Sequence, residues 1–209
     1  MKTSRRARRQ SGSEFVEFLL ITLFLAPLLL MSFTTGMNLI RANQCTAVAR
    51  DIGNMYIHGV DFSQSVNKDL AVRLAHGLNL QNSSTSGDGV IILSQVTFIG
   101  DTTCTANGLS GAACVNRNQY VFTMRITIGN TSLRSSSLGT PTASVNSGGY
   151  VQNFLTDMGA RANASFGSLW NPALADGQLV YATEAFFNSV TLNGVTSSGG
   201  GGVYARNFF

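Results

Sequence analysis

Residues 12–33 of this 209-residue chain read GSEFVEFLLITLFLAPLLLMSF, and this stretch decides how the rest is arranged. From Phe18 onward it is almost entirely apolar, and about 20 apolar residues at about 1.5 Å each suffice to cross a bilayer as one helix. The sequence therefore predicts a transmembrane helix over residues 13–37. Pro27 lies inside it and should bend the helix, which membrane helices tolerate.

The segment before this helix is strongly basic. Five of the 14 Lys and Arg side chains fall within residues 1–12, which hold no acidic residue. Because cationic flanks remain on the cytoplasmic side of a membrane, the N-terminus is expected in the cytoplasm and residues 38–209 outside it. The expected location is thus the inner (cytoplasmic) membrane, crossed once.

The remainder of the chain is nearly neutral. The formal charge of +4 comes from the leader, since residues 13–209 carry nine basic and ten acidic side chains. A nucleic-acid-binding domain would need a basic patch on its folded part, so the expected partner is membrane lipid and not nucleic acid. The chain length leaves room for one extracytoplasmic domain after the membrane helix.

Glu17 does not suit a simple membrane anchor. It lies at the edge of the apolar run, where an unpaired carboxylate in hydrocarbon costs roughly 2.5 kcal/mol or more. A cut between Gly12 and Ser13 would place a new amino terminus about one helical turn before Glu17. The amine and the carboxylate could then neutralise each other, within one chain or between neighbouring chains.

The order of basic leader, Gly12, four residues, Glu17-Phe18 and apolar helix resembles type IV prepilins of the Flp/Tad branch. More narrowly, Val16-Glu17-Phe18 and the Leu-rich run with Pro27 are similar to the opening of the TadE family of minor pilins, or pseudopilins. Residues 178–187 and 203–209 are also similar to the end of that family's domain. The resemblance implies that a membrane prepilin peptidase cleaves after Gly12 and that Glu17 sets the register of assembly.

The resemblance also implies a function. The chain would be a structural subunit of a Tad-type pilus or a related apparatus, used for adhesion or secretion, with no enzymatic activity and no cofactor. Its partners would be the prepilin peptidase, other pilin subunits and the Tad assembly machinery, and it could reach a surface pilus. The alternative is an uncleaved single-pass envelope protein whose outer domain binds a ligand or partner.

The sequence indicates neither an enzyme nor a metal site. It has no phosphate loop and no Gly-x-Ser-x-Gly, and His58 and His76 lie far in sequence from the cysteines. Cys104 and Cys114 share one polar loop on the oxidising side of the membrane, where a disulfide is expected and two free thiols are the alternative. Cys45 lies on the first helix and is expected to be a small packed side chain.

Helical spacing continues past the membrane. Apolar residues recur every three or four positions to about His58, and Gly59 is a natural stop, so one helix is expected from about Glu14 to His58. Its second half is amphipathic. A second helix is expected next, capped by Ser63 or Ser65, with a shared apolar face formed by Val66, Leu70, Leu74 and Leu78.

The rest of the chain predicts a small, mostly antiparallel sheet. Its expected strands are 90–99, 119–128, 178–187 and 203–209, the first two forming a hairpin around the cysteine loop. Glu184 in the third strand should face away from the packed side or pair with an arginine. The expected fold class is α+β, with the sheet packed on the amphipathic half of the long N-terminal helix.

Irregular segments are expected between these strands. They are a polar turn at 82–89, a long surface loop at 130–149, a short helix at 150–162, a turn at 170–172 and a flexible loop at 193–202.

Overall fold

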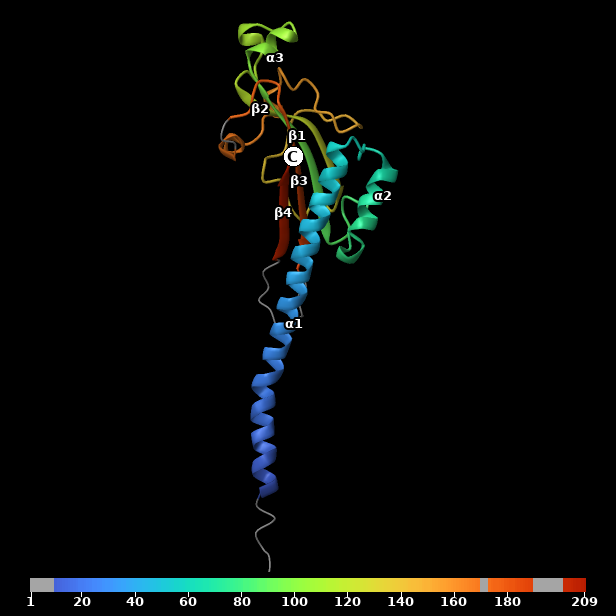
Figure 1. Ribbon diagram of the computed structural model, residues 1–209, viewed down its shortest axis with the longest axis vertical. Coiled ribbons are helices and arrows are strands. Elements are labelled where there is room, and N and C mark those ends of the chain that lie inside the picture. Colours follow the sequence, from blue (N-terminus) through green and yellow to red (C-terminus); the bar gives the residue numbers. More distant parts are fainter. Residues whose placement is uncertain (1–9, 170–172, 190–200) are drawn as a thin grey trace, which may run out of the picture.

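The computed structural model describes residues 10–169, 173–189 and 201–209. The leader as far as residue 9, the expected turn at 170–172 and most of the expected loop at 193–202 lie outside the described residues. The rest forms one long helix and a head built on a four-stranded sheet (Figure 1). The expected α+β fold class is therefore confirmed.

Helix α1 spans Gln10–Ile57 and continues through Pro27 without a break. Its large apolar side chains from Phe15 to Phe33 are all exposed, each by 39% or more. Figure 1 shows this half as a stalk that extends beyond the sheet, while the second half lies along the sheet. The helix ends just before Gly59, whose φ of +87° lies in the left-handed region that favours glycine.

The sheet is antiparallel throughout, in the order β2-β1-β3-β4. Its strands are β1 (Gly89–Ile99), β2 (Gln119–Gly129), β3 (Leu179–Asn188) and β4 (Gly202–Phe208). The first two form the expected hairpin, and β3 pairs with the other edge of β1. This register places Ile92 between Thr127 and Glu184.

The second half of α1 packs on one face of the sheet, against β3 and β4. Small or compact side chains on the helix, such as Ala49 and Ile52, are fully buried with Phe187 of β3. Gly53 permits a close approach of α1 to the C-terminal end of the chain, because a Cβ there would lie 2.2 Å from the Phe209 ring. This face is the apolar core that fixes the head on the helix.

Helix α2 (Ser65–Leu74) differs from its expected orientation. Leu78, just beyond it, is buried as expected, but Val66, Leu70 and Leu74 are 75%, 39% and 44% exposed. The buried side chains on this segment are instead Ala71 and Ala75. The small alanine methyl groups allow α2 to lie close to the core. The face with the larger side chains, Val66, Leu70 and Leu74, then points outward.

The start of α2 also differs from its prediction. Neither Ser63 nor Ser65 caps the helix, since the N-cap residue is Gln64 and it makes no side-chain capping bond. The Asp61 carboxylate accepts a hydrogen bond from the Ser63 backbone N–H instead, at 2.9 Å. The turn before α2 is therefore organised by an aspartate that precedes both serines.

The short helix expected at residues 150–162 was wrong. The segment consists of turns and isolated bridges, with one short 3₁₀ helix, η3 (Met158–Ala160). The buried Asn116 amide donates to the backbone carbonyls of Phe154 and Asp157, at 2.8 and 2.6 Å. These tertiary bonds occupy carbonyls that a helix would have used, and tertiary context overrides the local spacing.

The segment from 130 to 149 is a loop, as expected, but part of it is packed. It crosses the face of the sheet opposite α1 and buries Leu138 and Ala143 there, in a cluster with Val121 and Phe122 of β2. The head therefore has three layers: helix, sheet and irregular chain. The third layer creates the polar site described next.

Candidate membrane helix and polar site of the head

The first half of α1 has the properties of a membrane-spanning helix. The segment that begins at Glu14 contains an 18-residue window of mean hydropathy 2.3, none of which is buried inside the molecule. The hydroxyls of Thr22 and Thr35 donate to backbone carbonyls one turn earlier, at 2.8 Å each. Side chains satisfied in this way suit a medium without water, so this single helix is compatible with crossing a membrane once.

The residues expected to direct processing lie at the start of α1. Gly12 and Ser13 are in its first turn, and Glu17 and Phe18 follow one turn later. Both Glu17 and Phe18 are exposed, and Glu17 has no ion-pair partner within the described residues. The positions of Ser13 and Glu17, four apart on a helix, place them on the same side of α1.

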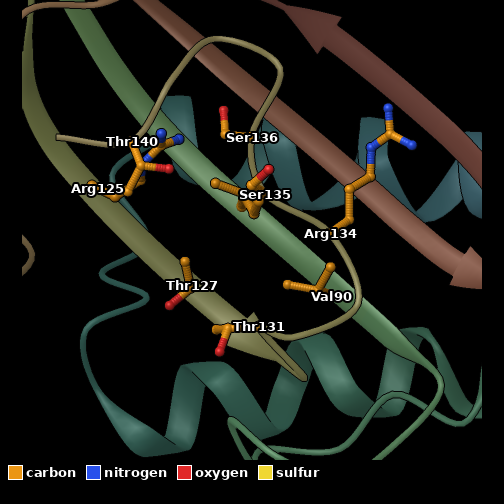
Figure 2. Close-up of a pocket in the computed structure, with 9 residues that line it drawn as sticks. Val90, Arg125, Thr127, Thr131, Arg134, Ser135, Ser136 and Thr140 are labelled. Atoms are coloured by element: carbon orange, nitrogen blue, oxygen red, sulfur yellow. The ribbon is translucent and has the colours of Figure 1, made fainter.

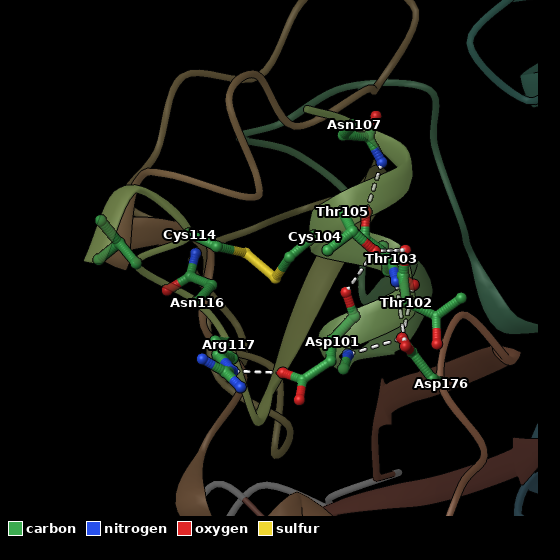
Figure 3. The surroundings of a disulfide bond; sticks show 12 residues. Asp101, Thr102, Thr103, Cys104, Thr105, Asn107, Cys114, Asn116, Arg117 and Asp176 are labelled. Atoms are coloured by element: carbon green, nitrogen blue, oxygen red, sulfur yellow. Dashed lines mark hydrogen bonds and ion pairs between the residues drawn. A yellow bond between two sulfur atoms is a disulfide. The ribbon is translucent and has the colours of Figure 1, made fainter. Parts of the chain in front are cut away.

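The cysteine loop forms the tip of the head, far from the start of α1 (Figure 1). Cys104 and Cys114 are joined by a disulfide, as the sequence predicted, between α3 (Asp101–Ala106) and the residue after the short 3₁₀ helix η2 (Gly111–Ala113). Figure 3 shows Asp101 and Arg117 paired beside it. The disulfide thus closes the connection between β1 and β2.

Asp176, which lies just before β3, anchors this tip to the start of that strand. Its carboxylate accepts hydrogen bonds from the Gly100 N–H at 2.6 Å and from the Thr103 N–H and hydroxyl at 3.0 and 2.5 Å. Burial acts to raise the pKa of Asp176, but these hydrogen bonds outweigh it and lower that pKa to about 2. The carboxylate is therefore a structural acceptor at the start of α3.

Cys45 is a buried packing residue. Its side chain is fully buried, and its Sγ donates to the Ala185 carbonyl oxygen at 3.5 Å. Burial raises the pKa of this thiol to about 11, so the reactive thiolate is disfavoured. The described residues contain no cluster of three or more His, Cys, Asp or Glu that could hold a metal ion.

Glu184 is the most heavily bonded side chain on the sheet face opposite α1. It is 2% exposed and accepts hydrogen bonds from the Ser137 N–H at 2.9 Å, the Ser137 hydroxyl at 2.6 Å and the Tyr204 hydroxyl at 2.6 Å. The Ser136 hydroxyl also donates to it. Burial alone would raise the pKa of Glu184, yet these donors together hold it below its ordinary value.

Arg125 is the buried cation of the same face. It is 8% exposed, and its guanidinium donates to the Ser94 hydroxyl and the Gly139 carbonyl. Burial lowers its pKa to about 10, while electrostatic attraction to Glu184 opposes the change. Glu184 therefore faces away from α1, as expected, but its direct partners are serines and a tyrosine rather than an arginine.

A pocket lies beside this polar pair, between the segment 131–140 and strands β1 and β2 (Figure 2). It has a volume of about 220 Å³. The pocket is lined by Val90, Ile92, Arg125, Thr127, Thr131, Arg134, Ser135, Ser136 and Thr140. The sequence pattern did not predict this site, although Arg125 and Glu184, each a single charge within an apolar strand, indicate a buried polar contact.

Comparison of the chain with protein-family models, with curated proteins and with solved structures finds no match. The function is therefore argued from the helix, the polar face and the pocket themselves. Fold alone does not identify function, whereas the chemistry of specific residues can.

Proposed function

We propose that this chain is a pilin-like structural subunit, a minor pilin or pseudopilin of a Tad-type fibre or a related secretion or adhesion apparatus. In this proposal a prepilin peptidase removes the leader after Gly12. The cleaved chain is then held in the cytoplasmic membrane by the first half of α1, with the head outside, until it joins other subunits.

The observation that carries the proposal is the continuity of α1. One helix of 48 residues is exposed and apolar in its first half and is part of the head's core in its second half. A tether for an independent domain needs no fixed geometry between membrane and head. A subunit that must stack with others does, because its buried helix and its head have to adopt one register.

Glu17 supports the same proposal. It is exposed on the apolar half of α1, where an unpaired carboxylate is unfavourable in lipid. After cleavage, the Ser13 amine of the same chain or of a neighbour would neutralise it. A charge pair of this kind favours one axial register over others, which is the best-attested use of a buried polar pair.

Mass spectrometry of the protein isolated from cells tests the cleavage. We expect a mature N-terminus at Ser13, and we expect Gly12→Val to abolish this processing. Gly36→Val is the matched control, because it lies on the same helix and a Cβ there would contact nothing within 4 Å. An intact leader on the native chain would contradict the proposal and favour the uncleaved envelope protein.

Glu17→Ala tests the charge pair separately from cleavage. We expect the variant to be processed after Gly12 but to be depleted from sheared fibre fractions, because its register with neighbours is lost. Glu14→Ala is the control, since Glu14 is also exposed and lies one helical turn earlier. If both variants entered fibres as well as the native chain, the proposed role of Glu17 would be wrong.

A further inference from the structure

The pocket on the sheet face opposite α1 has the size of a site for one small ring. Its volume is about 220 Å³, and a cavity of about 150 Å³ is known to hold benzene. Val90 and Ile92 of β1 contribute apolar surface to it, and hydroxyl side chains from β2 and from the segment 131–140 surround that surface. One six-membered ring therefore fits, whereas a dinucleotide-sized cofactor does not.

The charge of the pocket favours an anion. Among the residues that the structure describes, two arginines line it, Arg125 and Arg134, and no carboxylate does. The nearby Glu184 is outside the lining, and its oxygens already accept hydrogen bonds from Ser136, Ser137 and Tyr204. Arg125 is attracted to Glu184, but among the described residues it forms no ion pair with it. The positive charge of the two arginines still lowers the cost of binding a negative group there.

Arg125 can still make direct contacts with a ligand. Its guanidinium has five N–H donors, and within the described residues two hydrogen bonds are formed, to Ser94 and Gly139. Figure 2 places Arg125 next to Thr140 at one end of the pocket. Arg134 points away, with its guanidinium 4.2 Å from the centre of the Tyr204 ring, so it adds charge more than contact.

The hydroxyl groups of the pocket have unused bonding capacity. Within the part of the chain that the structure describes, the side chains of Thr127, Ser135 and Thr140 make no hydrogen bond. A hydroxyl can both donate and accept, which suits the hydroxyls of a sugar. The aliphatic side chains of Val90 and Ile92 suit the C–H face of the same ring.

We propose that this pocket binds one uronic-acid ring. Its carboxylate lies at the end formed by Arg125 and Thr140, and its hydroxyls face Thr127 and Ser135. The ring lies against Val90 and Ile92. The site belongs to the head and is independent of whether the chain enters a fibre, so it would apply equally to an uncleaved membrane protein.

Calorimetric titration of the full chain in detergent micelles tests this site with glucuronate as the probe. We expect glucuronate to bind at least about tenfold more tightly than glucose, because hydrogen bonds to a charged group contribute more than neutral ones. We also expect acetate, which has the carboxylate without the ring, to bind at least about tenfold more weakly than glucuronate. Equal binding of glucose or of acetate would overturn the assignment, as would no heat of binding at tens of millimolar glucuronate.

Three variants localise the binding. Ser135→Phe should fill the pocket and abolish binding, whereas Ser144→Phe, on the same connection but outside the pocket, should leave it unchanged. Thr127→Val keeps the shape and removes one hydroxyl, so it should weaken binding about fivefold. Native-like affinity in Ser135→Phe would overturn the proposal, provided its circular dichroism matches that of Ser144→Phe.

A short galacturonate oligomer, titrated beside monomeric galacturonate, distinguishes the source of the ring. Tighter binding of the oligomer assigns the pocket to acidic polysaccharide, and equal binding assigns it to a free sugar acid; both support the site. Failure of both ligands, together with failure of glucuronate, overturns it. None of these outcomes depends on cleavage after Gly12, so this test and the test of the proposed function can fail separately.

Discussion

The sheet is covered on one face by α1 and on the other by the segment 130–169, and only the second cover adds hydrogen bonds to buried charges to its apolar packing. On the α1 face, Leu93, Ile126 and Phe187 are buried among other apolar side chains. On the opposite face, Arg125 and Glu184 lie under the irregular segment, which is bonded to both. The α1 cover is held chiefly by apolar burial, whereas the other combines an apolar cluster around Leu138 with hydrogen bonds to two buried charges.

This difference has consequences for what each face can do. Apolar burial is non-directional, so α1 stays attached through many interchangeable contacts. Hydrogen bonds to a buried charge are directional, so Glu184 fixes where residues 136 and 137 lie. Both faces therefore contribute apolar burial, and the opposite face in addition positions a loop, several of whose residues line the pocket.

Neighbouring phenylalanines on β3 offer the largest test of this comparison. Phe187 is fully buried on the α1 face, where its ring lies over Gly89, and Phe187→Ala should destabilise the head by about 4 kcal/mol. Phe186 is 8% exposed on the other face, and Phe186→Ala should cost about 2 kcal/mol, because the irregular cover beside it can relax. Urea unfolding of the full chain in detergent, followed by circular dichroism, measures both.

The order of these two effects is what matters. If Phe186→Ala lowered the free energy of unfolding as much as Phe187→Ala, the irregular cover would pack around its phenylalanine as rigidly as α1 does around Phe187. The distinction between the two faces would then be wrong.

The α1 face could be anticipated from the sequence because its signals are local. Apolar spacing from Leu39 to Tyr56 indicated the amphipathic half of the helix, and the alternation from Met124 to Ile128 indicated the part of β2 that faces it. The opposite face depends on contacts across long sequence separations, such as Glu184 with Ser137. A charge inside an apolar strand signals that such a partner exists, but not which residue it is.

The same reason explains the helix wrongly expected at 150–162. The spacing of Val151, Phe154, Leu155 and Met158 suits a helix, yet Asn116, more than thirty positions earlier, binds the carbonyls of that segment. Single-sequence patterns do not contain that competition. The pocket was missed for the same reason, since its lining comes from two strands and a loop that only the fold brings together.

Glu184→Gln tests the hydrogen-bonded face next. The substitution keeps the shape of the side chain but removes the charge to which four donor groups from three residues bind. It also removes the carboxylate that attracts the buried Arg125, so we expect a loss of about 3 kcal/mol. Asp101→Asn is the control, because that carboxylate pairs with Arg117 at the exposed tip and should matter little. Equal effects of the two substitutions in urea unfolding would show that burial of Glu184 has no special role.

The pH dependence of the stability difference between the native chain and Glu184→Gln gives a further test of the carboxylate. The pKa of Glu184 is lowered in the folded chain, so its contribution is full above the unfolded pKa of about 4.3 and is lost as the pH falls through the lower folded value. The native chain should therefore exceed Glu184→Gln in stability at pH 7, and the difference should shrink steadily below pH of about 4. A difference that stayed constant down to pH 2 would mean that the carboxylate charge is not what holds the loop.

The smallest expected effects concern α2, and they show which of its sides packs against the core on the α1 face of the sheet. Ala71 is fully buried there, so Ala71→Leu should overpack the contact and cost about 2 kcal/mol. Leu70 points outward, and Leu70→Ala should change the free energy of unfolding by less than about 0.5 kcal/mol. The sequence pattern alone predicts the reverse, since it assigns Leu70 to the buried side. Urea unfolding of these two variants therefore decides between the pattern and the observed packing, and a larger loss for Leu70→Ala would show that α2 is turned the other way in solution.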